Sequence, residues 1–228
     1  MGIRERQERD RGEVRRKILD AARDLFVAEG FRNVSIRKVA EKVEYSPAAL
    51  YGYFPSKDDL YFALAEEGFH MLFEFTNDPE IFGRDPLVAI RDGFLRYYQF
   101  SRLHPEYFEL MFLDRTVPRI GRDWERFSYV GQMIDEVCSV IQRAVDCGEL
   151  PAGTDPQVVF HILWIAVHGA ATATLCNRLA PDEDPDALAR DTLEAALAGL
   201  RCGIKTCFIP SQCAPASTPA SSVENDDA

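Results

Sequence analysis

Side chains suited to contact with DNA gather between residues 35 and 57 of the 228-residue chain. Hydroxyl and cationic groups can hydrogen bond to phosphate oxygens, and small side chains let a helix approach base edges in the major groove. The candidates are Ser35, Arg37, Lys38, Ser46, Ala48, Ala49, Tyr51, Tyr53 and Lys57. Ser35 and Ser46 have a second explanation, because a serine before a helix also caps its first turn without any DNA.

The charge distribution is compatible with such a contact. Residues 1–60 carry a formal charge of +2 and the remainder carries −13, which gives the net charge of −11. A more basic N-terminal part on an acidic chain indicates a local contact with a polyanion. The same asymmetry could also be no more than solvated charged surface.

Short helices must position these side chains. Apolar residues recur at three- and four-residue spacing through residues 13–29, then through 35–43 and 47–54, and again through 56–75. The two middle helices and the tight turn between them have the layout of a helix-turn-helix, which reads the major groove with its second helix. Residues 1–12 are polar, and we expect them to form a disordered arm.

The part of the chain that holds these helices, which we call the head, also resembles a known family. The run SIRKVAEKVEYSPAALYGYFPSKDDLYFAL and the preceding RRKILDAARDLFVAEGFRNVSI are similar to the DNA-binding domain of TetR/AcrR-family transcriptional regulators. The match covers roughly residues 13–75. The resemblance implies a repressor that binds a palindromic double-stranded DNA operator as a homodimer and is released by a small apolar or amphipathic effector.

The resemblance also assigns roles to single positions. It places Ser35, Tyr51 and Lys57 at phosphate-contact positions. It places Ala48 and Ala49 at the positions that read bases.

Three further positions bear on the operator. Arg37 takes the place of a polar residue that reaches the DNA. Glu44 replaces the usual turn glycine, and Gly52 replaces a frequent histidine. A carboxylate near DNA is unfavourable unless it points away, so the operator sequence cannot be taken from relatives.

Aromatic and sulfur side chains in the second part of the chain could line an apolar pocket with a few polar tips. The candidates are Phe94, Tyr97, Tyr98, Phe108, Met111, Phe112, Trp124, Met133, Trp164 and His168. Each of them could equally be ordinary core. The family resemblance is what implies a ligand pocket here.

One stretch, residues 158–175, is apolar on nearly all sides and must therefore be buried on all sides. Its small residues would allow close helix approach, and with residues 188–200 it could form half of a four-helix dimer bundle. The expected interface residues are Gly169, Ala170, Ala173, Leu193 and Leu197. A buried core helix of the monomer is the competing interpretation. A membrane span is disfavoured because His161 and His168 interrupt the stretch.

A smaller signature lies inside this stretch. The residues from Trp164 to His168-Gly169 resemble the Trp…His-Gly pattern of one C-terminal subgroup of the family.

The sequence therefore predicts an all-α chain: a three-helix helix-turn-helix head joined by a linking helix to a helical body for ligand binding and dimerisation. The expected parts are a disordered arm (1–12), the DNA-binding domain (13–75), the ligand-binding and dimerisation domain (76–204) and a disordered Pro/Ser/Ala-rich tail (205–228).

Other functional classes find little support in the residues. No nucleophile motif, phosphate loop or zinc pattern accompanies the four histidines and six cysteines, so we expect no enzyme activity, no cofactor and no metal. The charged N-terminus has no apolar signal segment, so we expect a cytoplasmic protein with no membrane partner. A helical adaptor that kept the fold without binding DNA remains the alternative to a repressor.

Overall fold

The structure, a computed structural model, describes residues 2–30, 33–115, 120, 127–203 and 205–210. These residues form helices, turns and loops without a strand, as the all-α prediction requires. The head consists of α1 (Ile3–Glu29), α2 (Ile36–Lys42) and α3 (Pro47–Tyr51), followed by the linking helix α4 (Lys57–Thr76). The body holds α5 (Pro79–Phe82), α6 (Pro86–Leu103), α7 (Pro105–Phe108), the π-helical turn η2 (Glu109–Leu113), α9 (Ser128–Asp146), α10 (Pro156–Leu175) and α11 (Pro185–Arg201).

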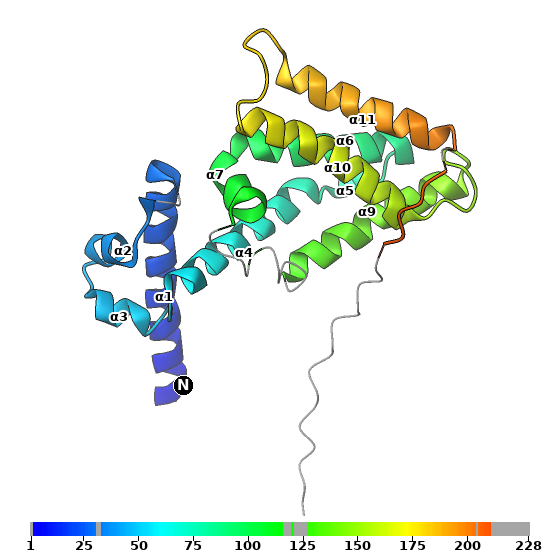
Figure 1. Cartoon of the computed structure of the whole chain (residues 1–228). Helices are drawn as coiled ribbons and strands as arrows, with labels where there is room; N and C mark the ends of the chain where they lie inside the picture. Colours follow the sequence, from blue (N-terminus) through cyan, green and yellow to red (C-terminus); the bar gives the residue numbers. More distant parts are fainter. Residues whose placement is uncertain (1, 31–32, 116–119, 121–126, 204, 211–228) are drawn as a thin grey trace, which may run out of the picture.

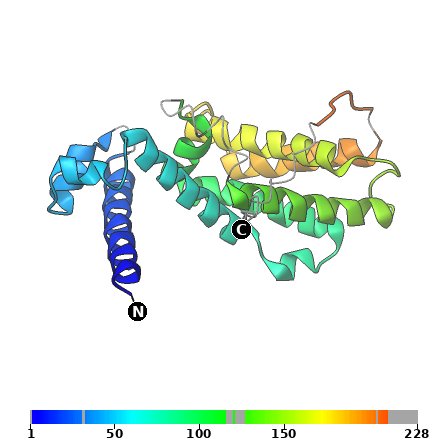
Figure 2. The same ribbon diagram turned by 90° about the horizontal axis from the view of Figure 1, so that it is seen from below.

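The head and the body lie at opposite ends of α4. Figure 1 shows α1, α2 and α3 as one group and the long helices α6, α9, α10 and α11 as another, with α4 running between them. The view from below in Figure 2 shows the same separation and the N-terminal end of α1 projecting from the head. A movement of α4 would therefore move the head relative to the body.

The predicted apolar stripes form the core of the head. Ile18 and Phe26 of α1, Val39 of α2, Leu50 of α3 and Leu64 of α4 are all fully buried. Burial of these side chains removes apolar surface from water and holds the short helices α2 and α3, which would be unstable alone.

The prediction of a disordered arm at residues 1–12 is wrong for the part that the structure describes. Helix α1 begins at Ile3 rather than near Glu13. Charged side chains four residues apart support this extension, because Arg9 pairs with Glu13. A polar composition is compatible with an exposed helix as well as with disorder.

One other boundary differs from expectation. Helix α3 ends at Tyr51 rather than at Phe54, with Gly52 at its end. Residues 205–210 of the predicted tail are described and contain no helix, and residues 211–228 lie outside the described residues.

Helix α10 is long and apolar enough to cross a membrane by length and composition alone, with a mean hydropathy of 1.7. In the structure it packs against α6, α9 and α11. Core helices of soluble proteins pass the same test, so this property is weak evidence for a membrane span.

Candidate DNA interface and effector cavity

The helix-turn-helix is held by capping hydrogen bonds at the start of each short helix. Ser35 Oγ accepts a hydrogen bond from the backbone N–H of Lys38, and Ser46 Oγ accepts one from that of Ala49. Both distances are 3.2 Å. Both hydroxyls therefore have a structural role, which is the alternative explanation that the sequence left open.

The remaining residues predicted to contact DNA differ in solvent exposure and in their ion pairs. The Arg37 side chain is 82% exposed and pairs with Glu41 on its own helix, whereas Lys38 Nζ lies 2.6 Å from Glu29 of α1. Ala48 and Tyr51 are exposed on α3. The structure thus presents Arg37, Ser46, Ala48 and Tyr51 to solvent, while Ser35 and Ala49 are half-buried.

Two of the predicted DNA-contact residues, Lys57 and Tyr53, take part in cation–π contacts. Lys57 Nζ lies 4.8 Å from the centroid of the Tyr61 ring, and the guanidinium of Arg11 lies 5.8 Å from that of Tyr53. Arg11 also donates to the carbonyl oxygen of Gly52, at 2.8 Å. Cation–π contact restricts the Lys57 ammonium to one region of the surface. The contacts of Arg11 join α1 to the end of α3.

Glu44, in the turn between α2 and α3, has a left-handed backbone with φ of 61°. A side chain at this φ costs conformational energy that glycine avoids. We expect Glu44→Gly to raise the free energy of unfolding by about 0.5–1 kcal/mol in urea denaturation. Glu44→Ala is the control, since it keeps a Cβ atom. An equal gain from Glu44→Ala would show that the side chain, not the backbone, is unfavourable.

The body contains a cavity of about 280 Å³ between α4, α6, η2, α9 and α10. Of the predicted pocket residues, Phe94, Tyr97, Met111, Phe112, Met133 and Trp164 line it. Further lining residues are Phe69, Thr76, Ala89, Ile90, Gly93, Val130, Ile134, Glu136, Val137, Val140, Phe160 and His161. The lining is mainly apolar, as expected for a small-molecule site.

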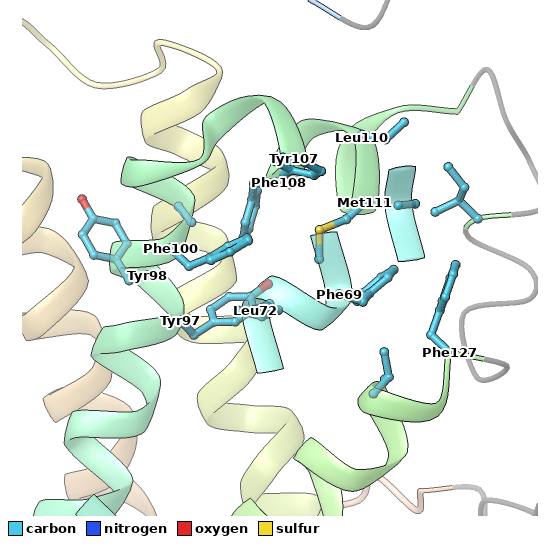
Figure 3. Close-up of a cluster of buried hydrophobic side chains, with 14 of the residues drawn as sticks. Phe69, Leu72, Tyr97, Tyr98, Phe100, Tyr107, Phe108, Leu110, Met111 and Phe127 are labelled. Carbon is cyan, nitrogen blue, oxygen red and sulfur yellow. The ribbon is translucent and has the colours of Figure 1, made fainter. Parts of the chain in front are cut away.

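Three predicted pocket residues, Tyr98, Phe108 and His168, do not line the cavity. Tyr98 points away from the aromatic cluster in Figure 3, and its hydroxyl donates to Asp186 of α11 at 2.8 Å. Phe108 is fully buried, with its ring 5.3 Å from that of His168. These residues lie behind the wall because neighbouring residues of one helix face different sides. A fourth, Trp124, lies outside the described residues.

A hydrogen-bonded group supports the cavity wall from behind. Tyr97 Oη lies 2.8 Å from His168 Nδ1 and also accepts a hydrogen bond from Trp164. Burial lowers the pKa of the His168 imidazole, which favours its neutral form. Burial also raises the pKa of the Tyr97 hydroxyl. Both shifts favour the uncharged forms of Tyr97 and His168.

A polar cluster joins the head to the body beside this wall. Glu67 Oε1 of α4 accepts hydrogen bonds from Arg23 of α1 and from the hydroxyl of Tyr107 of α7, both at 2.9 Å. Beside it, a Cβ atom on Gly68 would lie 2.6 Å from the sulfur of Met111, which lines the cavity. The wall residue Met111 therefore packs closely on the helix that carries Glu67 (Figure 3 shows Met111 and Tyr107 on adjacent turns).

The predicted dimer residues divide between core and surface. Leu193 is 0% exposed and Leu197 is 1% exposed, and Ala170 is also buried, so these three belong to the monomer core. Gly169 is exposed and Ala173 is half-buried. The apolar stripe of α11 faces α10 within the chain, which is why periodicity misassigned it.

An apolar face does remain open on α10 and α11. Ile165 is 58% exposed, one turn from Gly169, and Leu188 of α11 is 38% exposed. Ala195 and Ala198 extend this face along α11. We call these five residues the α10–α11 face.

Comparison with known families places both parts of the chain. The sequence model of bacterial regulatory proteins of the tetR family matches residues 18–64, and a tetracyclin repressor-like C-terminal domain matches residues 90–196. The first contains the helix-turn-helix, and the second contains most of the cavity.

Curated relatives and a solved structure agree with these matches. The HTH-type transcriptional regulator RutR of Escherichia coli O157:H7 is 29% identical over 152 residues, which are 66% of this chain and 70% of RutR. The HTH-type transcriptional repressor Rv1474c of Mycobacterium tuberculosis is 26% identical over 182 residues, 77% of this chain and 87% of Rv1474c. The TetR-family repressor FadR of Thermus thermophilus, solved in complex with lauroyl-CoA, has a TM-score of 0.62 and 18% identity, covering 86% of this chain and 99% of FadR. The last similarity concerns the fold alone.

Proposed function

Because this chain belongs to the TetR family of bacterial regulatory proteins, we propose that it is a repressor whose dimer binds a palindromic operator and leaves it when a small apolar or amphipathic effector fills the cavity. The observation that carries this proposal is the continuity of α4. Leu64 of α4 belongs to the core shared with the head, while Phe69 and Thr76 of the same helix line the cavity. The relatives with regulator and repressor names support it.

Release requires that the effector bind more tightly to the state with displaced heads than to the DNA-bound state. A ligand in the cavity presses on Met111, which packs on Gly68, and this contact lies beside the bonds of Glu67 to Arg23 and Tyr107. We propose that occupancy shifts α7 and η2 against α4 and so turns the head. The π-helical turn η2 suits this role, since such turns often occur at functional sites.

We propose that the DNA-facing surface consists of the exposed Arg37, Ala48 and Tyr51, with Lys57 beside it. The backbone at Ser35 and Ser46 would complete this surface. The N-terminal part of each chain, residues 1–60, carries a formal charge of only +2, so one head attracts DNA weakly. A dimer presents two heads to the DNA, which is needed for useful affinity.

Replacing Lys57 by alanine is expected to weaken binding to all DNA sequences by a similar factor. The slope of log affinity against log salt concentration should fall by about 1 for each phosphate that is no longer neutralised, because a phosphate contact releases counterions. Fluorescence anisotropy at several salt concentrations measures both quantities. Lys205→Ala, outside the head, is the matched control. A weakening confined to one base position would contradict the phosphate role of Lys57.

We propose that the α10–α11 face forms the homodimer interface, which keeps the expected Gly169 and replaces the buried Ala170, Leu193 and Leu197 by exposed neighbours. The half-buried Ala173 is not part of this face and stays a prediction. Small residues at such a face let two helix pairs approach closely. The likeness of Trp164, His168 and Gly169 to one C-terminal subgroup remains a prediction, as do the other domain boundaries and a cytoplasmic location.

The proposed function is tested by selecting DNA from a randomised pool with the full-length dimer and then adding compounds that raise its melting temperature. We expect a palindromic sequence to be enriched and at least one stabilising compound to release it. Stabilising compounds that leave DNA affinity unchanged would contradict the sensor role. If the protein remains a dimer at low salt but enriches no DNA sequence, the result would favour the alternative function, a helical adaptor that does not bind DNA.

A further inference from the structure

The polar groups that line the cavity differ in whether they have hydrogen-bonding capacity left for a ligand. The Tyr97 hydroxyl and the Trp164 indole N–H are already paired within the wall. The Thr76 hydroxyl donates to the carbonyl oxygen of Leu72, at 2.9 Å. These donors are used, so they offer little to an incoming molecule.

His161 has one ring nitrogen fixed by the backbone. Its Nδ1 lies 2.6 Å from the carbonyl oxygen of Gln157. A carbonyl oxygen only accepts, so Nδ1 carries the proton, and Nε2 of the neutral ring is an acceptor. In its neutral form, His161 therefore offers the cavity an acceptor at Nε2.

Glu136 is the one acidic residue among the described lining residues. Its Oε1 has a long contact of 3.5 Å with the side-chain amide of Asn77, and no ion pair of Glu136 occurs within the described part of the chain. The described lining also includes no Lys or Arg. The carboxylate is thus half-buried beside apolar walls without a cation.

This position has an electrostatic cost. Desolvation raises the pKa of the Glu136 carboxyl. A ligand cation beside the carboxylate would favour its charged form and gain a charge-assisted hydrogen bond. An anionic ligand would instead meet the like charge of the Glu136 carboxylate.

We propose that the effector of this protein is a small apolar amine, whose ammonium group is bound by Glu136 with His161 Nε2 as a second acceptor. The apolar part lies among Phe69, Phe94 and Phe160. This inference rests on the proposed function, because it names the ligand class of the same cavity.

The test uses three probes that share one apolar body and differ in the headgroup: 4-phenylbutylamine, 4-phenylbutanol and 4-phenylbutyrate. Isothermal titration calorimetry with the full-length dimer measures each Kd at neutral pH. We expect the amine to bind at least about tenfold more tightly than the alcohol or the acid, since a hydrogen bond to a charged group has that value.

Three variants separate the carboxylate from the rest of the site. Glu136→Gln should raise the Kd of the amine by about tenfold and leave the Kd of the alcohol nearly unchanged. Glu136→Lys should reverse the order and favour 4-phenylbutyrate, which also shows that the cavity is still folded. Asp135→Asn, on the adjacent exposed position of α9, is the matched control and should bind the amine as the unchanged protein does.

Equal affinity for the three probes, or an amine Kd that does not respond to Glu136→Gln, would overturn the inference. If the acid or the alcohol then still binds and releases the selected DNA, the ligand class is wrong and the sensor function stands. If no probe of any headgroup binds, the inference fails. The proposed function fails separately, if no compound that stabilises the protein releases the selected DNA.

Discussion

Replacing Ile165 by arginine is expected to convert the dimer to a monomer at micromolar concentration and to remove most of its affinity for DNA. Ile165 is the most exposed large apolar side chain of the α10–α11 face. In a twofold interface each substitution occurs twice. An unpaired buried charge costs about 3–5 kcal/mol, so even one such charge weakens association by roughly a hundredfold to a few thousandfold.

Dissociation of the dimer should carry over to DNA binding, because a monomer contacts only one half-site. Sedimentation velocity measures the oligomeric state, and fluorescence anisotropy measures binding to the selected DNA. Val27→Arg is the matched control, since Val27 is 51% exposed on α1, far along the chain from this face. An Ile165→Arg protein that remains dimeric at low micromolar concentration would place the interface elsewhere.

Replacing Glu67 by alanine is expected to lower the free energy of unfolding by about 2–4 kcal/mol. The change removes the acceptor shared by Arg23 and Tyr107. Tyr107 is only 3% exposed, so its buried hydroxyl loses this hydrogen-bond acceptor. Hydrogen bonding to Glu67 also raises the pKa of Arg23, which is consistent with a stabilised charged pair. Urea denaturation measures the decrease.

The same variant should weaken the link between effector and DNA. Glu67 is the residue of α4 that bonds to both the head and α7, so its removal should shrink the effector's effect on DNA affinity several-fold. Glu66→Ala, at the adjacent exposed position, should change stability by less than about 0.5 kcal/mol. A Tyr107→Phe change made together with Glu67→Ala should cost less than the sum of the single changes, because it removes the unpaired hydroxyl. Additive effects would contradict a direct contact.

The head was predictable from sequence because its signals are local. Apolar spacing defined the buried faces through Ile18, Val39 and Leu50, and serines marked the starts of α2 and α3. The first residues of α1 were missed because pairing such as that between Arg9 and Glu13 stabilises a helix that composition alone presents as disordered.

The body was harder to predict because periodicity identifies an apolar face but not what covers it. Leu193 and Leu197 face α10 of the same chain, whereas Ile165 faces solvent, and both patterns look alike in sequence. Tyr97 and Tyr98 are neighbours, yet only the first lines the cavity. Glu136 gave a usable signal: a carboxylate three residues after Met133 and four before Val140, inside an apolar stripe.

We expect the cavity and the DNA-binding head to be energetically coupled. The most direct test is the Kd of the best-binding phenylbutyl probe, measured by calorimetry with and without saturating selected DNA. Coupling is reciprocal, so bound DNA should lower the affinity for the probe by the same factor by which the bound probe lowers the affinity for DNA. We expect both factors to agree and to exceed about fivefold. An identical probe Kd in the presence and absence of bound DNA would contradict coupling between the cavity and the head.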